Sequence, residues 1–292
     1  MNLFLRSLLI LVVIFAAVPE FGQDITFEGE VNLVEVYATV FDHDGQTVAG
    51  LSKDQFAILD NGKARQIRAF EPTYRALSCA LLLDTTGSMK FAMPALINGA
   101  RDFISALRPG DSVGLYAFTD HLEQLQEMST DREASAAVLT QLRVEGRTAL
   151  FDSIAELAVD LEKRPGKKAI VVLTDGGDNA SVLNREAAVA SARKAGVPIF
   201  AVAEGEALHD DTAADLLRDL AEATGGRMYK ANHSKQIGTV FQAVGRYLQN
   251  GYLLAFQAPT EAKGKSWHDL QVVVKNAPEP LKVRARTGYS IE

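Results

Sequence analysis

The sequence predicts an α/β protein in which a doubly wound, mainly parallel sheet is inserted into a small β-sandwich-like module. Two observations predict this class. From about residue 76 to 250, short continuously apolar runs alternate with Ala-rich amphipathic stretches, the pattern of a parallel sheet covered on both faces. On either side, at residues 24–75 and 251–292, the pattern becomes that of short strands separated by turn residues.

Residues 1–23 are predicted to be a signal peptide. Arg6 precedes an unbroken run of eleven apolar residues, Leu8–Val18, and Pro19 follows it. This run is too short for a transmembrane helix, which needs about 20 residues, but a basic start with such a run is typical of an export signal. We expect a secreted or periplasmic protein with no membrane span after signal cleavage. An uncleaved N-terminal anchor is the alternative.

The segment 24–75 contains two strand signals. Val34, Val36, Ala38 and Val40 alternate with other side chains, a period of two that predicts a strand. Asn61-Gly62 favours a type I′ turn and predicts a hairpin between residues 56–59 and 67–70. A β-sandwich takes about 100 residues, so we expect this segment to pack with residues 251–292 as one module.

The central region, residues 76–250, alternates predicted strands and helices. The strands are expected at residues 78–83, 113–118, 169–173, 197–202 and 227–229. The helices are expected at residues 93–107, 132–142, 150–161, 184–194, 212–223 and 235–248.

The C-terminal segment, residues 251–292, returns to strands at residues 252–256, 270–275 and 281–286. In the last of these, Lys282, Arg284 and Arg286 alternate with apolar residues. This basic row is interpreted as a solvent-exposed face, with a binding surface as the alternative.

Composition excludes several classes of function. The chain has 30 Lys and Arg against 37 Asp and Glu, a net charge of −7, which disfavours nucleic acid as a partner. Its single cysteine, Cys79, excludes an intramolecular disulfide and a thiolate metal cluster.

Polar residues follow two of the predicted parallel strands. Asp84, Thr86 and Ser88 come after residues 79–83, Asp175 follows residues 169–173, and Thr148 lies at a loop-to-helix junction between them. Because the carboxyl ends of parallel strands meet at one edge, these oxygen-bearing side chains are expected to meet there. Such a set suits Mg²⁺ or Mn²⁺. The alternative is that these residues only cap loops and helices. Asp120 and Asp178, also near strand ends, are interpreted as turn or surface residues.

The residues Asp84-x-Thr86-x-Ser88, Thr148 and Asp175 together resemble the metal-ion-dependent adhesion site of the von Willebrand factor type A (vWFA) domain. The resemblance covers about residues 76–250 and implies a Rossmann-like fold. It also implies that Thr86 and Ser88 bind the metal directly, that Thr148 does so in a ligand-competent state, and that Asp84 and Asp175 act directly or through water. A partner protein's Asp or Glu would complete the shell, in protein–protein interaction or adhesion. Thr86 departs from the Ser usual in the family, and its extra methyl group stiffens χ1.

The whole chain further resembles a bacterial, acidobacterial-type group of vWFA-related proteins. The resemblance rests on residues 40–56 before the central region and on two stretches after it, which begin at Tyr252 and end at Tyr289.

Signals of catalysis are weak, and we predict that the protein is not an enzyme. The chain has no His-Glu-x-x-His motif, and Gly264-Lys265-Ser266 lacks the first glycine of a P-loop. Two alternatives stay open: a structural or assembly module whose metal serves folding only, and a metal-dependent phosphoryl-transfer enzyme using Asp84. In the second, Thr86 stands where a second acid is expected. No sequence feature indicates a defined oligomer.

Overall fold

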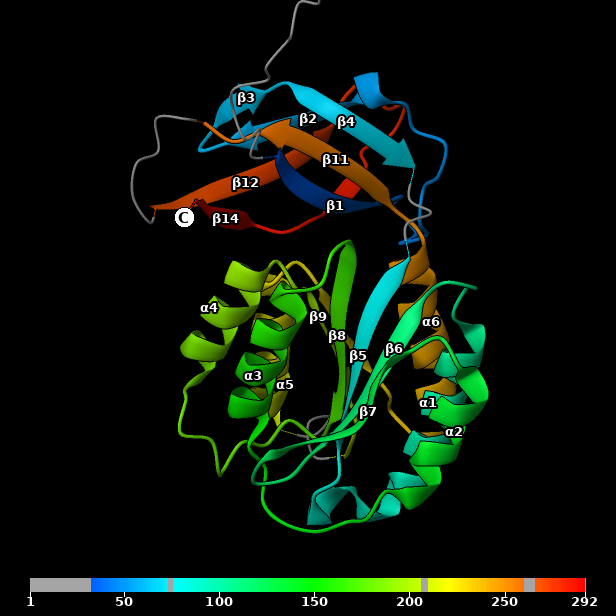
Figure 1. Cartoon of the computed structure of the whole chain (residues 1–292). Coiled ribbons are helices and arrows are strands. Elements are labelled where there is room, and N and C mark those ends of the chain that lie inside the picture. Colours follow the sequence, from blue (N-terminus) through cyan, green and yellow to red (C-terminus); the bar gives the residue numbers. More distant parts are fainter. Residues whose placement is uncertain (1–32, 73–75, 206–209, 260–265, 292) are drawn as a thin grey trace, which may run out of the picture. The chain divides into compact units, whose positions relative to one another are not determined.

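The computed structural model describes residues 33–72, 76–205, 210–259 and 266–291. The predicted signal peptide lies outside these residues. The described chain forms a six-stranded sheet flanked by helices and two four-stranded sheets (Figure 1). None of the helices in these ranges is long and apolar enough to cross a membrane.

The six-stranded sheet has the order β10-β9-β8-β5-β6-β7, with β5 and β8 side by side at its centre. Its parallel strands match the five strands predicted for the central region: β5 (Leu77–Asp84), β6 (Ser112–Phe118), β8 (Lys167–Thr174), β9 (Ile199–Ala203) and β10 (Arg227–Lys230). The sequence had not predicted β7 (Leu122–Ser129), which runs antiparallel to β6. This edge strand carries Glu and Gln side chains and is half-exposed, so it lacks the apolar run that marks its neighbours.

Helices cover both faces of this sheet, as expected for a doubly wound fold (Figure 1). On one face, Leu81 and Leu83 of β5 pack in a core with Phe103 and Phe241. On the other, Leu82 packs with the apolar residues of α3, α4 and α5. The helices are α1 (Met93–Ala106), α2 (Arg132–Val138), α3 (Leu150–Glu162), α4 (Arg185–Ala195), α5 (Asp211–Ala223) and α6 (Ile237–Gln249).

Local capping sets the limits of several helices. The Asn184 side chain accepts a hydrogen bond from the Ala187 N–H at the start of α4, and Gly196 ends this helix with a left-handed φ of 64°. Asp131 and Asp210 cap α2 and α5 in the same way at their N-termini. These polar residues explain why the amphipathic patterns predicted the helices to within a few residues.

The two segments flanking the central region build one β-sandwich module. One sheet has the order β13-β1-β11-β4 and the other β14-β12-β2-β3, so each contains strands from both segments. The strands are β1 (Leu33–Phe41), β2 (Phe56–Asp60), β3 (Lys63–Arg65), β4 (Ile67–Pro72), β11 (Tyr252–Gln257), β12 (Ser266–Val274), β13 (Lys282–Arg284) and β14 (Gly288–Ile291). Their shared core includes Val36, Ile58, Leu254 and Phe256. This arrangement confirms the predicted fold class.

The predicted hairpin was wrong in one of its strands. Asn61 and Gly62 have φ angles of 48° and 76°, which suit the expected type I′ turn. However, the strand that returns after this turn is β3, which pairs with β2, whereas β4 pairs with β11 in the other sheet. Ile67 and Phe70 are apolar because they pack against the sandwich core from the other sheet.

Candidate functional site

The candidate site begins where β5 and β8 end side by side. The two strands pair in parallel with Leu83 opposite Leu173, so Asp84 and Thr174 emerge at the same edge of the sheet. The Thr174 hydroxyl donates a hydrogen bond of 2.6 Å to Asp84 Oδ2. Both residues are fully buried.

The loop after β5 folds back onto the same carboxylate. The N–H and the hydroxyl of Thr86 both donate to Asp84 Oδ1, at 2.9 and 2.6 Å. Thr86 Oγ1 also lies 3.1 Å from Ser88 Oγ. Asp84, Thr86 and Ser88 therefore form one continuous cluster, in which Asp84 and Thr86 are buried while Ser88 is exposed.

The orientation of the Thr86 hydroxyl suits it to bind a cation. A hydroxyl has one proton and two acceptor lone pairs. Because Thr86 gives its proton to Asp84, its lone pairs stay available to another group. The neighbouring Ser88 hydroxyl adds a second oxygen on the exposed side.

The electrostatics of Asp84 also favour a nearby positive charge. Burial raises the pKa of its carboxyl group to about 6, against the opposing effect of the hydrogen bonds from Thr174 and Thr86. The charge of Asp175 raises this pKa further, so the two carboxylates lie close enough to interact. A divalent cation between them would offset both the burial and the repulsion.

Asp175 and Thr148 lie on adjoining loops. Asp175 directly follows β8 and is 6 % exposed. Thr148, which is 4 % exposed, is held by its backbone: its N–H donates to Asn179 Oδ1 at 3.0 Å, and its carbonyl accepts from the Asn179 N–H at 2.9 Å. The Glu145 N–H donates to the Thr85 carbonyl, which ties the loop before α3 to the loop after β5.

The structure thus joins Asp84, Thr86 and Ser88 directly. Asp175 lies close enough to Asp84 for their charges to interact, and Thr148 follows Glu145, which ties its loop to the loop after β5. Sequence reasoning missed two positioning residues, Thr174 and Asn179. Thr174 could have been found from its place beside Asp175 at the strand end. The role of Asn179 depends on a contact with Thr148, 31 positions earlier in the chain, which no local pattern reveals.

Two other carboxylates near strand ends have local roles. Asp178 Oδ2 accepts from the Phe151 N–H in the first turn of α3 and from the Ser181 hydroxyl. Asp120 is exposed and contacts its neighbours Thr119 and His121. In the described part of the chain, no group of three or more His, Cys, Asp or Glu side chains is arranged to hold a metal. A cation at this edge would therefore depend on hydroxyl oxygens as well.

An α/β domain with carboxylates and hydroxyls at the carboxyl edge of its sheet defines the class of this protein. Residues 79–177 match the family described as the von Willebrand factor type A domain. This match and the similar solved structure below show that the six-stranded sheet and its helices have the vWFA fold.

Three similar proteins illustrate the relationship. The UPF0353 protein of Mycolicibacterium vanbaalenii is 26 % identical over 221 residues, and the match covers 65 % of each chain, so this chain spans about two thirds of that relative's length. The solved structure of a von Willebrand factor type A protein from Catenulispora acidiphila has a TM-score of 0.54 at 15 % identity, covering 84 % of this chain and 75 % of that one. A mutant of the PilB minor pilin from Streptococcus sanguinis has a TM-score of 0.50 at 16 % identity, covering 61 % and 62 %.

Proposed function

We propose that this protein recognises another protein through a divalent cation at the carboxyl edge of its central sheet. Asp84, Thr86, Ser88, Thr148 and Asp175 would hold Mg²⁺ or Mn²⁺, and an Asp or Glu of the partner would complete the coordination. The bound ion would supply an electrophilic centre that attracts a carboxylate oxygen.

The observation that carries this proposal is the cluster of Asp84, Thr86 and Ser88. Its donors are all oxygen atoms, which is the set that Mg²⁺ and Mn²⁺ prefer. Only two of the five side chains carry a negative charge, so a bound ion would keep much of its attraction for an outside carboxylate. The vWFA fold supports an interaction role rather than catalysis.

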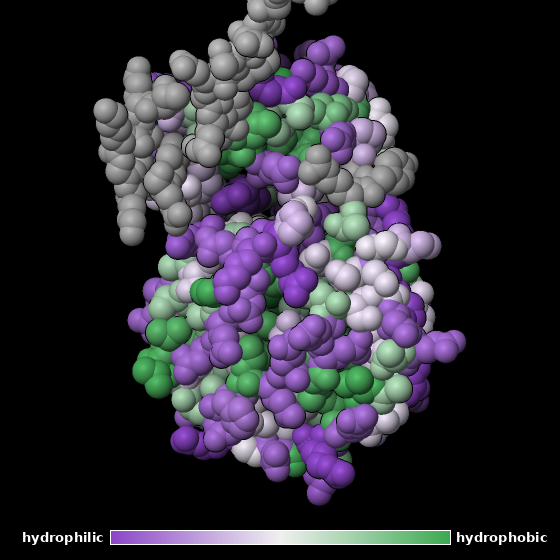
Figure 2. Space-filling view, viewed as in Figure 1, coloured by the Kyte–Doolittle hydropathy of each residue, from purple (hydrophilic) through white to green (hydrophobic). Residues whose placement is uncertain are grey.

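The surface is consistent with recognition through a few polar contacts. On the face shown in Figure 2, hydrophobic residues lie in small separate patches among hydrophilic ones over the vWFA domain. Broad apolar docking is not favoured on that face. A metal-centred contact, by contrast, needs only a small area to be specific.

The geometry disfavours the phosphoryl-transfer alternative. A nucleophilic carboxylate must reach the phosphorus atom of its substrate. Asp84 is fully buried, and both of its oxygens accept hydrogen bonds from Thr86 or Thr174. This arrangement suits a residue that orients ligands, and we propose a protein that is not an enzyme.

We further propose that the protein acts outside the cytoplasm, in a secreted or periplasmic form. The basic start and the apolar run within residues 1–23 support this proposal. N-terminal sequencing of protein recovered from periplasm and medium tests it. A mature N-terminus near residue 24 is expected, and a chain that keeps Met1 in the cytoplasm would contradict it.

Calorimetric titration of Mg²⁺ and Mn²⁺ into chelator-stripped protein tests the metal site. Saturable one-site binding is expected for the wild type and its loss for Asp84→Ala. Asp120→Ala is the matched control, because it removes an exposed carboxylate at the end of the neighbouring strand β6. Absence of wild-type binding, both alone and with millimolar glutamate to stand in for the partner, would overturn the proposal.

The structural alternative makes a different prediction. If the ion serves folding only, metal removal lowers the melting temperature, but glutamate or an acidic peptide does not tighten metal binding. If the ion serves recognition, a carboxylate ligand and the metal each raise the affinity for the other. Measuring Mg²⁺ affinity with and without glutamate therefore separates the two roles.

A further inference from the structure

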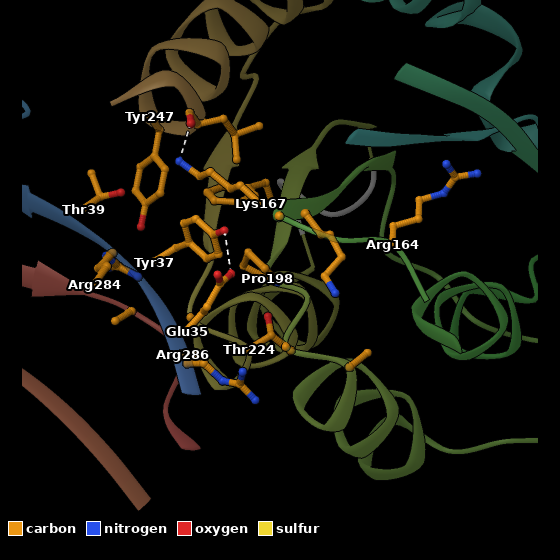
Figure 3. Close-up of a pocket in the computed structure, with 18 of the residues that line it drawn as sticks. Glu35, Tyr37, Thr39, Arg164, Lys167, Pro198, Thr224, Tyr247, Arg284 and Arg286 are labelled. Carbon is orange, nitrogen blue, oxygen red and sulfur yellow. Dashed lines mark hydrogen bonds between the residues drawn. The ribbon is translucent and has the colours of Figure 1, made fainter. Parts of the chain in front are cut away.

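A cavity of about 230 Å³ (Figure 3) is lined by the first residues of β8, at the opposite end of this strand from the candidate metal site. Its walls come from both parts of the fold. The β-sandwich module contributes residues of β1 and of the segment 284–286, and the vWFA domain contributes the start of β8 and the end of α6. Lys167, the first residue of β8, therefore lines the cavity. Thr174, the last residue of the same strand, lies at the sheet edge that bears Asp84.

The cavity has tightly packed walls. Arg284 donates to the Gly226 carbonyl at 2.7 Å, and the Thr287 hydroxyl donates to the Ala223 carbonyl at 3.3 Å. A Cβ added to Gly225 would lie 2.6 Å from the Ala285 carbonyl oxygen. This contact between the segment 284–287 and the vWFA domain holds the cavity's wall in place.

The lining is strongly basic in a protein of net charge −7. Its cationic side chains are Arg164, Lys167, Lys168, Arg284 and Arg286, and among the described lining residues Glu35 is the carboxylate. Arg164 extends away from the other labelled side chains, but Lys167, Arg284 and Glu35 lie around the same space (Figure 3). The sequence had interpreted the row containing Arg284 and Arg286 as solvent-exposed. The structure corrects this for both residues, which are half-buried against the vWFA domain.

Several of these cationic side chains donate hydrogen bonds to neutral backbone carbonyl groups. Lys167 donates to the Leu248 carbonyl at the end of α6, and Arg286 Nε donates to the Gly288 carbonyl at 2.8 Å. Arg284 lies 3.6 Å from Glu222, a carboxylate that is half-exposed. Carbonyl oxygens satisfy N–H donors but offset less charge than a carboxylate does.

Burial makes this charge costly. Lys167 is 6 % exposed, and burial lowers its pKa to about 8. Burial also lowers the pKa of Lys168 and of Arg286, and the charge of Arg286 lowers that of Lys168 further, against the opposing effect of the charges of Glu162 and Glu35. Partly buried cations close enough to repel each other gain most from a bound anion.

We propose that this cavity binds a small organic anion that carries phosphate or carboxylate oxygens. Lys168 and Arg286 would supply the charge, and the Tyr247 hydroxyl, which also lines the cavity, would add a polar contact. The hydroxyls of Tyr37 and Thr39 donate instead to Glu35 Oε2 and to the Asn250 carbonyl. Its volume admits a compact anion rather than a polymer. Because the walls come from both parts of the fold, such an anion would bridge the β-sandwich module and the vWFA domain.

Titration of inorganic phosphate and of citrate into the metal-free protein tests this site. Both are measured by calorimetry and by thermal unfolding at pH 7 and constant ionic strength. The two probes distinguish phosphate from carboxylate recognition. Saturable binding of at least one is expected, together with a rise in melting temperature. Absence of saturable binding by either would overturn the proposal.

Variants locate the binding in the cavity. Lys168→Gln with Arg286→Gln should weaken it by about tenfold or more, whereas Lys163→Gln, an exposed lysine just before β8, should leave it unchanged. Circular dichroism and the Mg²⁺ titration check that the double variant is folded. Equal binding by the double variant and the wild type would contradict the proposal. Binding that persists in Asp84→Ala would show that it does not depend on the metal site.

Discussion

Side chains of opposite charge lie at the two ends of the central strands β5 and β8. At the carboxyl end, Asp84 and Asp175 lie among hydroxyl groups, whereas at the amino end Lys167 and Lys168 lie in a cavity with Arg284 and Arg286. Parallel strands make this separation possible, because they bring like ends of different strands to the same edge. The carboxyl end is built within one domain, but the amino end needs the β-sandwich module to complete it. We therefore propose that the sheet serves a cation at one end and an anion at the other.

The largest expected effect is the loss of metal binding at the carboxyl end. Asp84→Asn keeps the size of the side chain but removes its charge, and we expect Mg²⁺ affinity to fall by at least about a hundredfold. Phosphate or citrate binding at the amino end should be unchanged. Calorimetry with each ligand checks both statements, and a parallel loss of both would show that the two ends are not independent.

The second prediction concerns the pH dependence that arises at the amino end. The ordinary lysine pKa of 10.5 falls to about 8 for buried Lys167, so between these values the unfolded chain binds more protons than the folded one. The contribution of Lys167 to the free energy of unfolding should therefore rise as the pH increases from 8 toward 10.5, by up to about 3 kcal/mol.

Urea unfolding at pH 8 and pH 10 in phosphate-free buffer measures this change. Lys167→Met should lack the rise, and the difference between the two proteins removes the contribution of tyrosines, which titrate in both. Lys163→Met is the control, because that lysine is 75 % exposed. If the difference in the free energy of unfolding between the wild type and Lys167→Met does not change with pH, the expected lowering of the Lys167 pKa is contradicted.

A third prediction sharpens the role of the hydroxyl groups. Thr86→Val keeps the shape of the side chain but removes the oxygen, and Mg²⁺ affinity should fall about tenfold. Thr86→Ser keeps the oxygen and should bind almost as the wild type does. Paired titrations of the two variants decide this. Equal affinities would show that the Thr86 oxygen does not bind the ion.

The smallest effect is expected at Asp178, which caps α3 beside the candidate site. Asp178→Ala should lower the free energy of unfolding by about 1 kcal/mol through the lost hydrogen bond to the Phe151 N–H. Metal affinity should hardly change. Thermal unfolding and Mg²⁺ titration test this, with Asp160→Ala as an exposed control on the same helix. A large loss of metal affinity would make Asp178 part of the site.

Sequence reasoning succeeded where chemistry is local. The continuous apolar runs indicated β5, β6 and β8, because a strand covered on both faces excludes polar residues. The same reasoning missed β7, since a half-exposed edge strand has no such requirement. It also placed β4 beside the wrong strand, because the local pattern of a strand does not specify which sheet it joins.

The prediction of the candidate site had the same limit, because it identified only relations between residues that are close in the chain. Asp84, Thr86 and Ser88 are close in the chain, so their spacing was sufficient to select them as a cluster. Their hydrogen bonds to the neighbouring strand were not visible, because Thr174 lies 90 positions away from Asp84.

The amino acid sequence by itself determined the alternation of strands and helices, the pairing of the two outer segments in one module and the choice of oxygen-bearing residues at the strand ends. These properties follow from local periodicity and composition. Only the tertiary structure decided that Arg284 and Arg286 lie beside Lys167 in a shared cavity. The physical reason is that an alternating basic strand is compatible both with solvent and with another part of the fold, and only tertiary packing decides which of the two it meets.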